Sequence, residues 1–235
     1  MGIPLRHELK YLLMPWQVDV LRRNLTPILS LDPNAQKHGG EYHIRSLYFD
    51  TVYDSALYEK MSGVYERQKY RMRIYNYSDR EIFMECKSKY GALISKRSVK
   101  IPRELADQII ACDPSGLENT PAGLLKDVYR EMRTRLLHPV VIVDYTREAY
   151  LHPAETVRIT FDKGLHTGLG STDIFNPYLP TISPFDQDYT VLEVKYDRML
   201  PPYIAELLSW AVPEACRSAV SKYTWCRRFE GKDDI

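Results

Sequence analysis

The stretches Arg71-Met72-Arg73 and Glu85-Cys86-Lys87-Ser88-Lys89 decide the fold, because charged and uncharged residues alternate along both of them. Successive side chains of a β-strand point to opposite faces, so each stretch would place its charges on one face of a sheet. The same even spacing recurs in three other pairs of charges: Glu8 and Lys10, Arg158 and Asp162, and Glu193 and Lys195. One face of the predicted sheet is therefore densely ionic, and a bound polyanion would explain why so many cations converge there.

Composition and charge bound the class of protein. With 235 residues, of which 44% are hydrophobic and 27% charged, the chain has the composition of a globular protein, and we expect one domain over residues 1–235. The net charge is only +1, which argues against a basic surface built to bind nucleic acid nonspecifically. A cationic site must therefore be local, and its partner should be small or threaded through it.

We expect neither a membrane span nor a secretion signal. No apolar stretch approaches the roughly 20 residues that span a bilayer, and the first ten residues carry Arg6, Glu8 and Lys10 instead of an apolar core. We therefore expect a cytoplasmic protein without a membrane span. The four cysteines show no CxxC spacing, so neither a zinc site nor a disulfide framework is predicted.

Strand-like segments recur along the chain with short connections, and helical segments lie between and after them. The predicted strands cover residues 6–13, 42–50, 66–75, 81–89, 93–101, 139–150, 156–163 and 189–196. The predicted helices cover residues 16–25, 53–61, 102–112 and 121–136, and a further helical region lies toward the C-terminus. Residues 32–34 are predicted to form a loop and residues 77–79 a turn.

Two arrangements fit an antiparallel sheet with one ionic face: a helix-backed open sheet that exposes this face, or a closed barrel that encloses it. Closure is favoured, because it removes the edges through which a long antiparallel sheet misassociates. The predicted fold class is α+β, an eight-stranded, mainly antiparallel β-barrel with helices packed outside. Because unpaired buried charges are costly, the interior must stay wet or hold a highly charged ligand.

Eight short motifs occur in order along the chain. They are RHELKY (6–11), SLYFDT (46–51), RMRIY (71–75), ECK (85–87), VDYTR (143–147), RITFD (158–162), LEVK (192–195) and SKY (221–223). Together they resemble the VTC domain, the polyphosphate polymerase branch of the triphosphate tunnel metalloenzymes within the CYTH-like superfamily. The resemblance covers about residues 6–227.

The resemblance implies an enzyme with a tunnel of eight antiparallel strands, which transfers the γ-phosphate of ATP to a growing polyphosphate chain with the help of Mn²⁺ or Mg²⁺. The residues that it implies for phosphate contact and catalysis are Lys10, Arg71, Arg73, Lys87, Lys96, Arg147, Arg158 and Lys222. Further substrate contacts are expected from Glu8, Lys89, Lys195, Ser221 and Tyr223, and Glu193 is expected to hold the metal. Phosphoryl transfer needs positioning and charge neutralisation more than a protein nucleophile, which agrees with this set of residues.

One departure bears on the reaction. Hydrolytic and cyclase members of the superfamily open with Glu-x-Glu-x-Lys, whereas Arg6 stands here in place of the first Glu, which favours the VTC branch. Glu8 and Glu85 could ligate a second ion or pair with neighbouring cations. A metal-dependent triphosphate or tripolyphosphate hydrolase and a noncatalytic polyphosphate-binding module remain alternatives. Membrane-anchored members couple synthesis to translocation, so either this protein acts in the cytosol or a separate membrane subunit receives its product.

Overall fold

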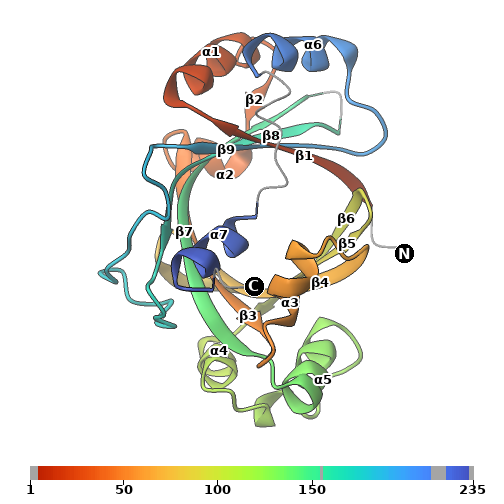
Figure 1. Ribbon diagram of the computed structural model, residues 1–235, viewed down its shortest axis with the longest axis vertical. Helices are drawn as coiled ribbons and strands as arrows, with labels where there is room; N and C mark the ends of the chain where they lie inside the picture. The colour runs from red at the N-terminus through yellow and green to blue at the C-terminus, as the bar shows by residue number, and fades with distance from the viewer. Residues whose placement is uncertain (1–4, 154–155, 213–220, 233–235) are drawn as a thin grey trace.

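A closed barrel of antiparallel strands organises the computed structural model, which describes residues 5–153, 156–212 and 221–232. The barrel strands are β1 (Arg6–Leu13), β3 (Glu41–Asp50), β4 (Glu66–Tyr75), β5 (Ser78–Tyr90), β6 (Leu93–Ile101), β7 (His138–Leu151), β8 (Arg158–Thr167) and β9 (Thr190–Tyr196). They follow the order β7-β3-β4-β5-β6-β1-β9-β8, and pairing of β7 with β8 closes the ring (Figure 1). This arrangement confirms the predicted fold class. A short further strand, β2 (Ser30–Leu31), pairs with one end of β7.

Cross-strand register decides which side chains enter the barrel. In the β4–β5 pair, Arg71 lies opposite Glu85, and their side chains meet inside the barrel. The adjacent residue Met72 lies opposite Met84, and both methionines are fully buried outside the barrel. The alternation in the sequence therefore becomes an ionic interior and an apolar exterior.

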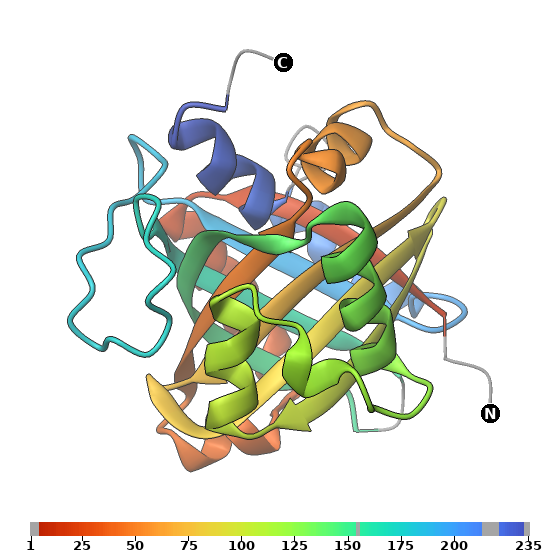
Figure 2. The same cartoon turned by 90° about the horizontal axis from the view of Figure 1, so that it is seen from below.

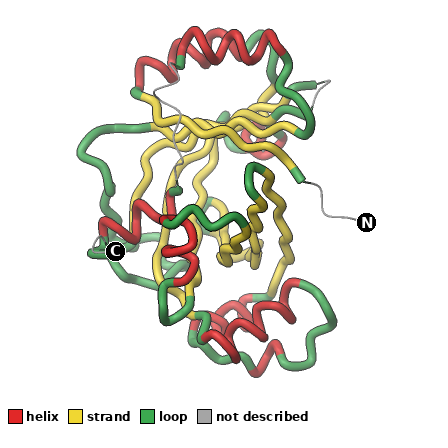
Figure 3. Tube along the Cα trace, turned by 45° about the vertical axis from the view of Figure 1, so that its right-hand side comes forward, coloured by secondary structure: helices red, strands yellow, loops and turns green. Residues whose placement is uncertain are grey.

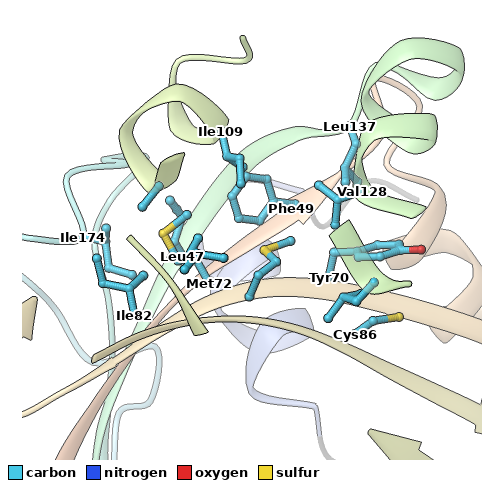
Figure 4. Packing of buried hydrophobic residues seen from close by; sticks show 14 of the residues in the cluster. Leu47, Phe49, Tyr70, Met72, Ile82, Cys86, Ile109, Val128, Leu137 and Ile174 are labelled. Carbon is cyan, nitrogen blue, oxygen red and sulfur yellow. The ribbon is translucent and has the colours of Figure 1, made fainter. Parts of the chain in front are cut away.

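Two layers of helices cover the exterior. One layer consists of α4 (Arg103–Ile110), the 3-10 turn η1 (Ser115–Leu117) and α5 (Leu124–Arg135), and it lies against β3 to β6 (Figure 3). Ile109 and Val128 of these helices belong to the same buried cluster as Phe49 and Met72 of the sheet (Figure 4). Burying each such side chain stabilises the fold by roughly 1.5–3 kcal/mol, so this layer holds one half of the barrel wall in shape.

The second layer is formed by α1 (Pro15–Leu25) and α6 (Pro202–Ala211), which cover β1, β8 and β9 (Figure 1). Pro15 suits the first turn of α1, and the Gln17 side chain accepts a hydrogen bond of 2.9 Å from the Met14 backbone N–H. Leu21 of α1 and Leu208 of α6 belong to the buried cluster beneath this layer. None of the described helices combines the length and apolarity that crossing a bilayer requires.

One end of the barrel is covered by α3 (Ser55–Met61) and α7 (Lys222–Phe229), which lie side by side (Figures 1 and 2). The apolar residues Tyr223 and Cys226 of α7 belong to one buried cluster with Tyr48, Val141 and Val143 of β3 and β7. The barrel interior therefore has an apolar wall, which binds α7, and an ionic wall opposite it.

Asp50, the last residue of β3, fixes the start of α3. Its carboxylate accepts hydrogen bonds from the backbone N–H groups of Thr51 and Ala56, each at 2.8 Å, and from that of Leu57 at 3.1 Å. A carboxylate at this place satisfies N–H groups that the first turn of a helix leaves free.

Two local predictions were wrong. Residues 32–34 do not form a loop: α2 (Pro33–Lys37) begins there, and the Asp32 carboxylate accepts a hydrogen bond of 2.7 Å from the Ala35 N–H. This helix is too short for its hydrophobic period to be read from the sequence. The turn predicted at residues 77–79 lies earlier, because Asn76 and Tyr77 have φ of 49° and 56° and both take the left-handed conformation of a tight hairpin turn.

Candidate functional site

Glu193, on β9, occupies the middle of the barrel interior. Its carboxylate lies 2.9 Å from Lys222 Nζ, 3.0 Å from Lys195 Nζ, 3.2 Å from Lys10 Nζ and 3.6 Å from an Arg147 nitrogen. Burial alone would raise the pKa of Glu193, but the four cations outweigh burial and hold the pKa well below its usual range. Glu193 is therefore ionised, and both of its oxygens face cations.

Asp162, on β8, is a second carboxylate of this interior and shares two cations with Glu193. Its oxygens accept hydrogen bonds of 2.6 and 2.7 Å from the Arg147 guanidinium, and it lies 2.6 Å from Lys222 Nζ. Burial alone would lower the pKa of Arg147, but the charge of Asp162 outweighs burial, and the pKa of Arg147 lies well above its usual value. Asp162 therefore forms buried ion pairs with both cations.

Glu85, on β5, gathers the cations of the neighbouring strands. Arg71 donates to it at 2.8 Å from Nε, Lys96 at 2.8 Å, and Arg73 lies 3.9 Å away. Arg73 also donates to the hydroxyl of Tyr145 at 3.0 Å. The Lys96 side chain is 52% exposed, so it lies at the rim of the barrel, whereas Arg71 and Arg73 lie inside it.

Glu8, on β1, completes the group of carboxylates. It lies 2.7 Å from Lys87 Nζ, 3.5 Å from Lys195 Nζ and 3.6 Å from Lys10 Nζ. Burial is the largest effect on Lys87 and, together with the repulsion of Lys10 and Lys195, lowers the pKa of Lys87 to about 7 despite the attraction of Glu8. Glu8 therefore pairs with cations, which was one of the two roles that the sequence left open for it.

We use the term central cluster for these four carboxylates and the cations around them. It consists of Glu8, Glu85, Asp162 and Glu193 with Lys10, Arg71, Arg73, Lys87, Lys96, Arg147, Lys195 and Lys222. Its cations outnumber its carboxylates, although every carboxylate is already shared. The excess positive charge inside a narrow barrel is a site for an anion with several charges.

Three predicted site residues lie apart from the central cluster. Arg158 forms an ion pair of 2.6 Å with Asp32 beside α2. Tyr223 is 2% exposed, and its hydroxyl donates a hydrogen bond to Asp50, so it supports α3 and α7. Lys89 lies opposite Arg67 near the end of the β4–β5 pair and forms no ion pair with any described residue.

Ser221 and Lys69 meet at the edge of the central cluster. Ser221 caps α7 by accepting a hydrogen bond of 3.3 Å from the Thr224 N–H, and its hydroxyl oxygen also lies 3.1 Å from Lys69 Nζ, within hydrogen-bond distance. Lys69 Nζ further lies 4.6 Å from the centre of the Tyr223 ring. Burial, aided by neighbouring cations, holds the pKa of Lys69 well below its usual range.

Lys69 was missed at the level of sequence, although a signal was present. It stands two residues before Arg71 in the same alternation, so its side chain points to the same face of β4. No carboxylate pairs with it among the described residues. Lys69 is therefore an interior cation without an anionic partner in the described part of the chain.

The closed eight-stranded barrel has the triphosphate tunnel fold, and its interior is rich in cations. The model of the VTC domain matches residues 5–229, so the chain belongs to the VTC domain family. No curated protein sequence matches the chain significantly.

Solved structures resemble this fold at low sequence identity. A putative adenylyl cyclase from Hippeastrum, described as having a dominant triphosphatase activity, has a TM-score of 0.56 at 14% identity, with 95% of each chain covered. A protein from Pyrococcus horikoshii OT3 has a TM-score of 0.48 at 14% identity, with 95% of this chain and 98% of that chain covered. A putative adenylate cyclase from Bacillus halodurans has a TM-score of 0.48 at 15% identity, with 90% and 91% covered. At these identities the likeness shows the fold alone.

The residues of the central cluster fit a divalent cation in one respect. Glu193 offers two ionised oxygens, the kind of ligand that Mg²⁺ and Mn²⁺ prefer. The described residues contain no group of three or more His, Cys, Asp or Glu side chains that could hold a metal ion. An ion at Glu193 would therefore complete its coordination with phosphate oxygens and water, as Mg²⁺ usually does in phosphate sites.

Proposed function

We propose that this protein is an ATP-dependent polyphosphate polymerase, which transfers the γ-phosphate of ATP to a polyphosphate chain inside the barrel. Membership of the VTC domain family supports a metal-dependent activity on triphosphate or polyphosphate. The observation that carries the proposal is the excess of cations over carboxylates in the central cluster, because a bound polyphosphate would neutralise it. We further propose that residues 1–235 act as one domain in the cytoplasm.

The central cluster would act by exchange of partners. Arg147 and Lys222 contact Asp162 and Glu193 in the free protein. Phosphate oxygens entering the barrel would take over part of these contacts, with the planar guanidinium gripping two oxygens at once. We assign the same role to the remaining predicted cations: Lys10, Arg71, Arg73, Lys87, Lys96, Lys195 and, nearer α2, Arg158.

The transfer step needs no protein nucleophile. An oxygen of the terminal phosphate of the chain forms a bond to the γ-phosphorus of ATP, and the bond from that phosphorus to the oxygen that bridges it to the β-phosphate breaks, so that ADP leaves. The attacking phosphate is already anionic, so no general base must remove a proton. The cations of this chain hold the two phosphates in line and offset the charge that builds up between them.

Glu193 is the residue that we assign to the divalent ion. When bound, Mn²⁺ or Mg²⁺ supplies charge neutralisation and orientation of the phosphate oxygens. The contribution of Glu193 itself is to orient Lys10, Lys195 and Lys222, which surround it.

Hydrolysis of triphosphate or tripolyphosphate is the second candidate, and one observation favours it. Glu8 lies near Glu193, and both carboxylates contact Lys10 and Lys195, so two acidic groups face the same space. Against it, Arg6 replaces the first acidic residue of the hydrolytic motif and forms an ion pair of 2.6 Å with Asp197.

The decisive experiment incubates the purified protein with ATP and Mn²⁺ and separates the products by gel. We expect ADP together with long-chain polyphosphate. Orthophosphate without polymer would assign hydrolysis instead. Phosphate binding without either product would leave a noncatalytic polyphosphate-binding module, or a polymerase that depends on an activating membrane subunit.

A further inference from the structure

The ladder between β4 and β5 changes character along its length. In its middle part, opposite charges pair within the central cluster. Toward the barrel end beside α3, cations lie opposite cations: Lys69 faces Lys87, and Arg67 faces Lys89. Like charges directly opposite each other destabilise a pair of strands. This end of the ladder is therefore not arranged for stability of the free protein.

Among the described residues, Lys60, Arg67, Lys69 and Lys89 form no ion pair with a carboxylate, although the more distant charges of Glu59 and Glu8 attract Arg67 and Lys89, respectively. Lys60 of α3 lies close enough to Arg67 and Lys89 for their charges to lower its pKa, after burial as the largest cause. Among the described residues, Lys60 and Lys89 form no hydrogen bond or ion pair, and Arg67 donates only to the Val64 carbonyl. Lys87 differs from them, because it pairs with Glu8.

The electrostatics of Lys69 and Lys89 agree with this geometry. Burial comes first and cationic neighbours follow as the causes that lower the pKa of Lys69 and that of Lys89. The side chains of Lys60, Arg67, Lys69 and Lys89 all remain partly exposed, so a ligand from solvent can reach them. An anion placed among them would favour their charged forms and remove the mutual repulsion.

We propose that the group of Lys60, Arg67, Lys69 and Lys89, which we name the cationic mouth, binds phosphate groups of a polyphosphate chain beyond those held by the central cluster. The proposal rests on the proposed function and deepens it. Because a triphosphate already finds partners in the central cluster, the mouth adds affinity only for longer chains. It makes long-chain polyphosphate the preferred ligand, and it makes the barrel end beside α3 the end at which the chain leaves the barrel.

The test compares the binding of tripolyphosphate and of long-chain polyphosphate, without ATP, by calorimetry at several salt concentrations. The double variant Lys60→Gln and Lys89→Gln removes two charges of the cationic mouth. The matched control, Lys126→Gln with Arg133→Gln, removes two charges from the exposed face of α5, outside the barrel. A second variant, Lys60→Arg with Lys89→Arg, keeps both charges.

We expect the mouth variant to bind long-chain polyphosphate about tenfold more weakly, which corresponds to the loss of one or two charge-assisted hydrogen bonds. Its affinity for tripolyphosphate should change by less than about twofold. Its dependence of affinity on salt should also become shallower, since fewer counterions are released. The arginine variant should bind like the unmodified protein, and so should the α5 control.

Several outcomes would overturn the proposal. An equal loss for both ligands would mean that the substitutions disturb the central cluster, and an equal loss in the α5 control would mean that only overall charge matters. If the unmodified protein bound long chains no better than tripolyphosphate, the cationic mouth would be refuted while the proposed function stood. Binding of neither ligand would refute the proposed function as well.

Discussion

Substitution of Asp162 by Asn tests the idea that the central cluster is held together by carboxylates that a phosphate ligand can replace. Asp162 is almost fully buried, and it contacts both Arg147 and Lys222 at 2.6 Å. Asn keeps the shape of the side chain but removes its charge. Glu193 then remains the carboxylate shared by both cations.

The magnitude follows from the burial of the pair. Removing one partner of a buried ion pair destabilises a protein by roughly 3–5 kcal/mol, because the remaining charge is left uncompensated. We expect about 3 kcal/mol here, since Glu193 keeps part of the compensation. For a chain of this length that corresponds to a fall in Tm of roughly 6–12 °C. Tripolyphosphate should restore more stability to the variant than to the unmodified protein, because it supplies the missing negative charge.

Thermal unfolding with and without tripolyphosphate measures both effects. The control is Asp107→Asn, which removes one partner of an exposed ion pair between Arg103 and Asp107 on α4. Its Tm should fall by less than about 4 °C, since exposed pairs contribute roughly 0–1 kcal/mol. The reasoning is refuted if Asp162→Asn lowers Tm no more than this control does, or if tripolyphosphate raises Tm equally in variant and unmodified protein.

Four further predictions concern three single groups. The pKa of Lys87 is lowered to about 7 in the free protein, so Lys87 must take up a proton when phosphate binds above that pH. Tripolyphosphate affinity, measured by calorimetry, should therefore fall as pH rises from 7 to 9. The fall should be smaller in Lys87→Arg, whose side chain stays charged. Because the pKa of Lys87 is lower in the folded than in the unfolded state, Lys87 destabilises the folded protein most below pH 7 and less as pH rises toward its unfolded pKa. A plot of unfolding free energy against pH should therefore be flatter for Lys87→Met than for the unmodified protein. Glu193→Gln should abolish activation by Mn²⁺ while tripolyphosphate still binds; loss of both would contradict a role for Glu193 in holding the metal. Tyr223→Phe should cost about 1–3 kcal/mol of unfolding free energy, because Asp50 loses a buried donor, and a change of tripolyphosphate affinity beyond twofold would return Tyr223 to the phosphate site.

The sequence predicted the barrel because alternation is a local property of a strand. The charges of Arg71 and Glu85 share a face in any regular strand, and the interior position of that face followed from the cost of open edges. The short helix α2 and the early hairpin turn at Asn76 and Tyr77 were not predicted correctly, because each depends on one or two backbone conformations and not on a period.

The parts of the site that the sequence missed depend on tertiary register. Whether Lys69 has an anionic partner is decided by the residue opposite it on β5, which is Lys87 and not Glu85. The rotation of α7 likewise decides that Lys222 enters the central cluster while the next residue, Tyr223, packs on the apolar wall. A sequence motif predicts neither fact. Lys222 and Tyr223, for example, are consecutive in the chain, yet their side chains lie in different surroundings.

The position of β1 also constrains the order in which the chain can fold. This strand lies between β6 and β9, and its residue Leu9 pairs with Val194, far away in the sequence. Pairings between distant segments form slowly, because closing a long loop costs conformational entropy before the stabilising contacts form. During synthesis β1 emerges first, yet its longest ladder must wait for β9. The ring therefore closes late, and until then the ionic face lies open to solvent.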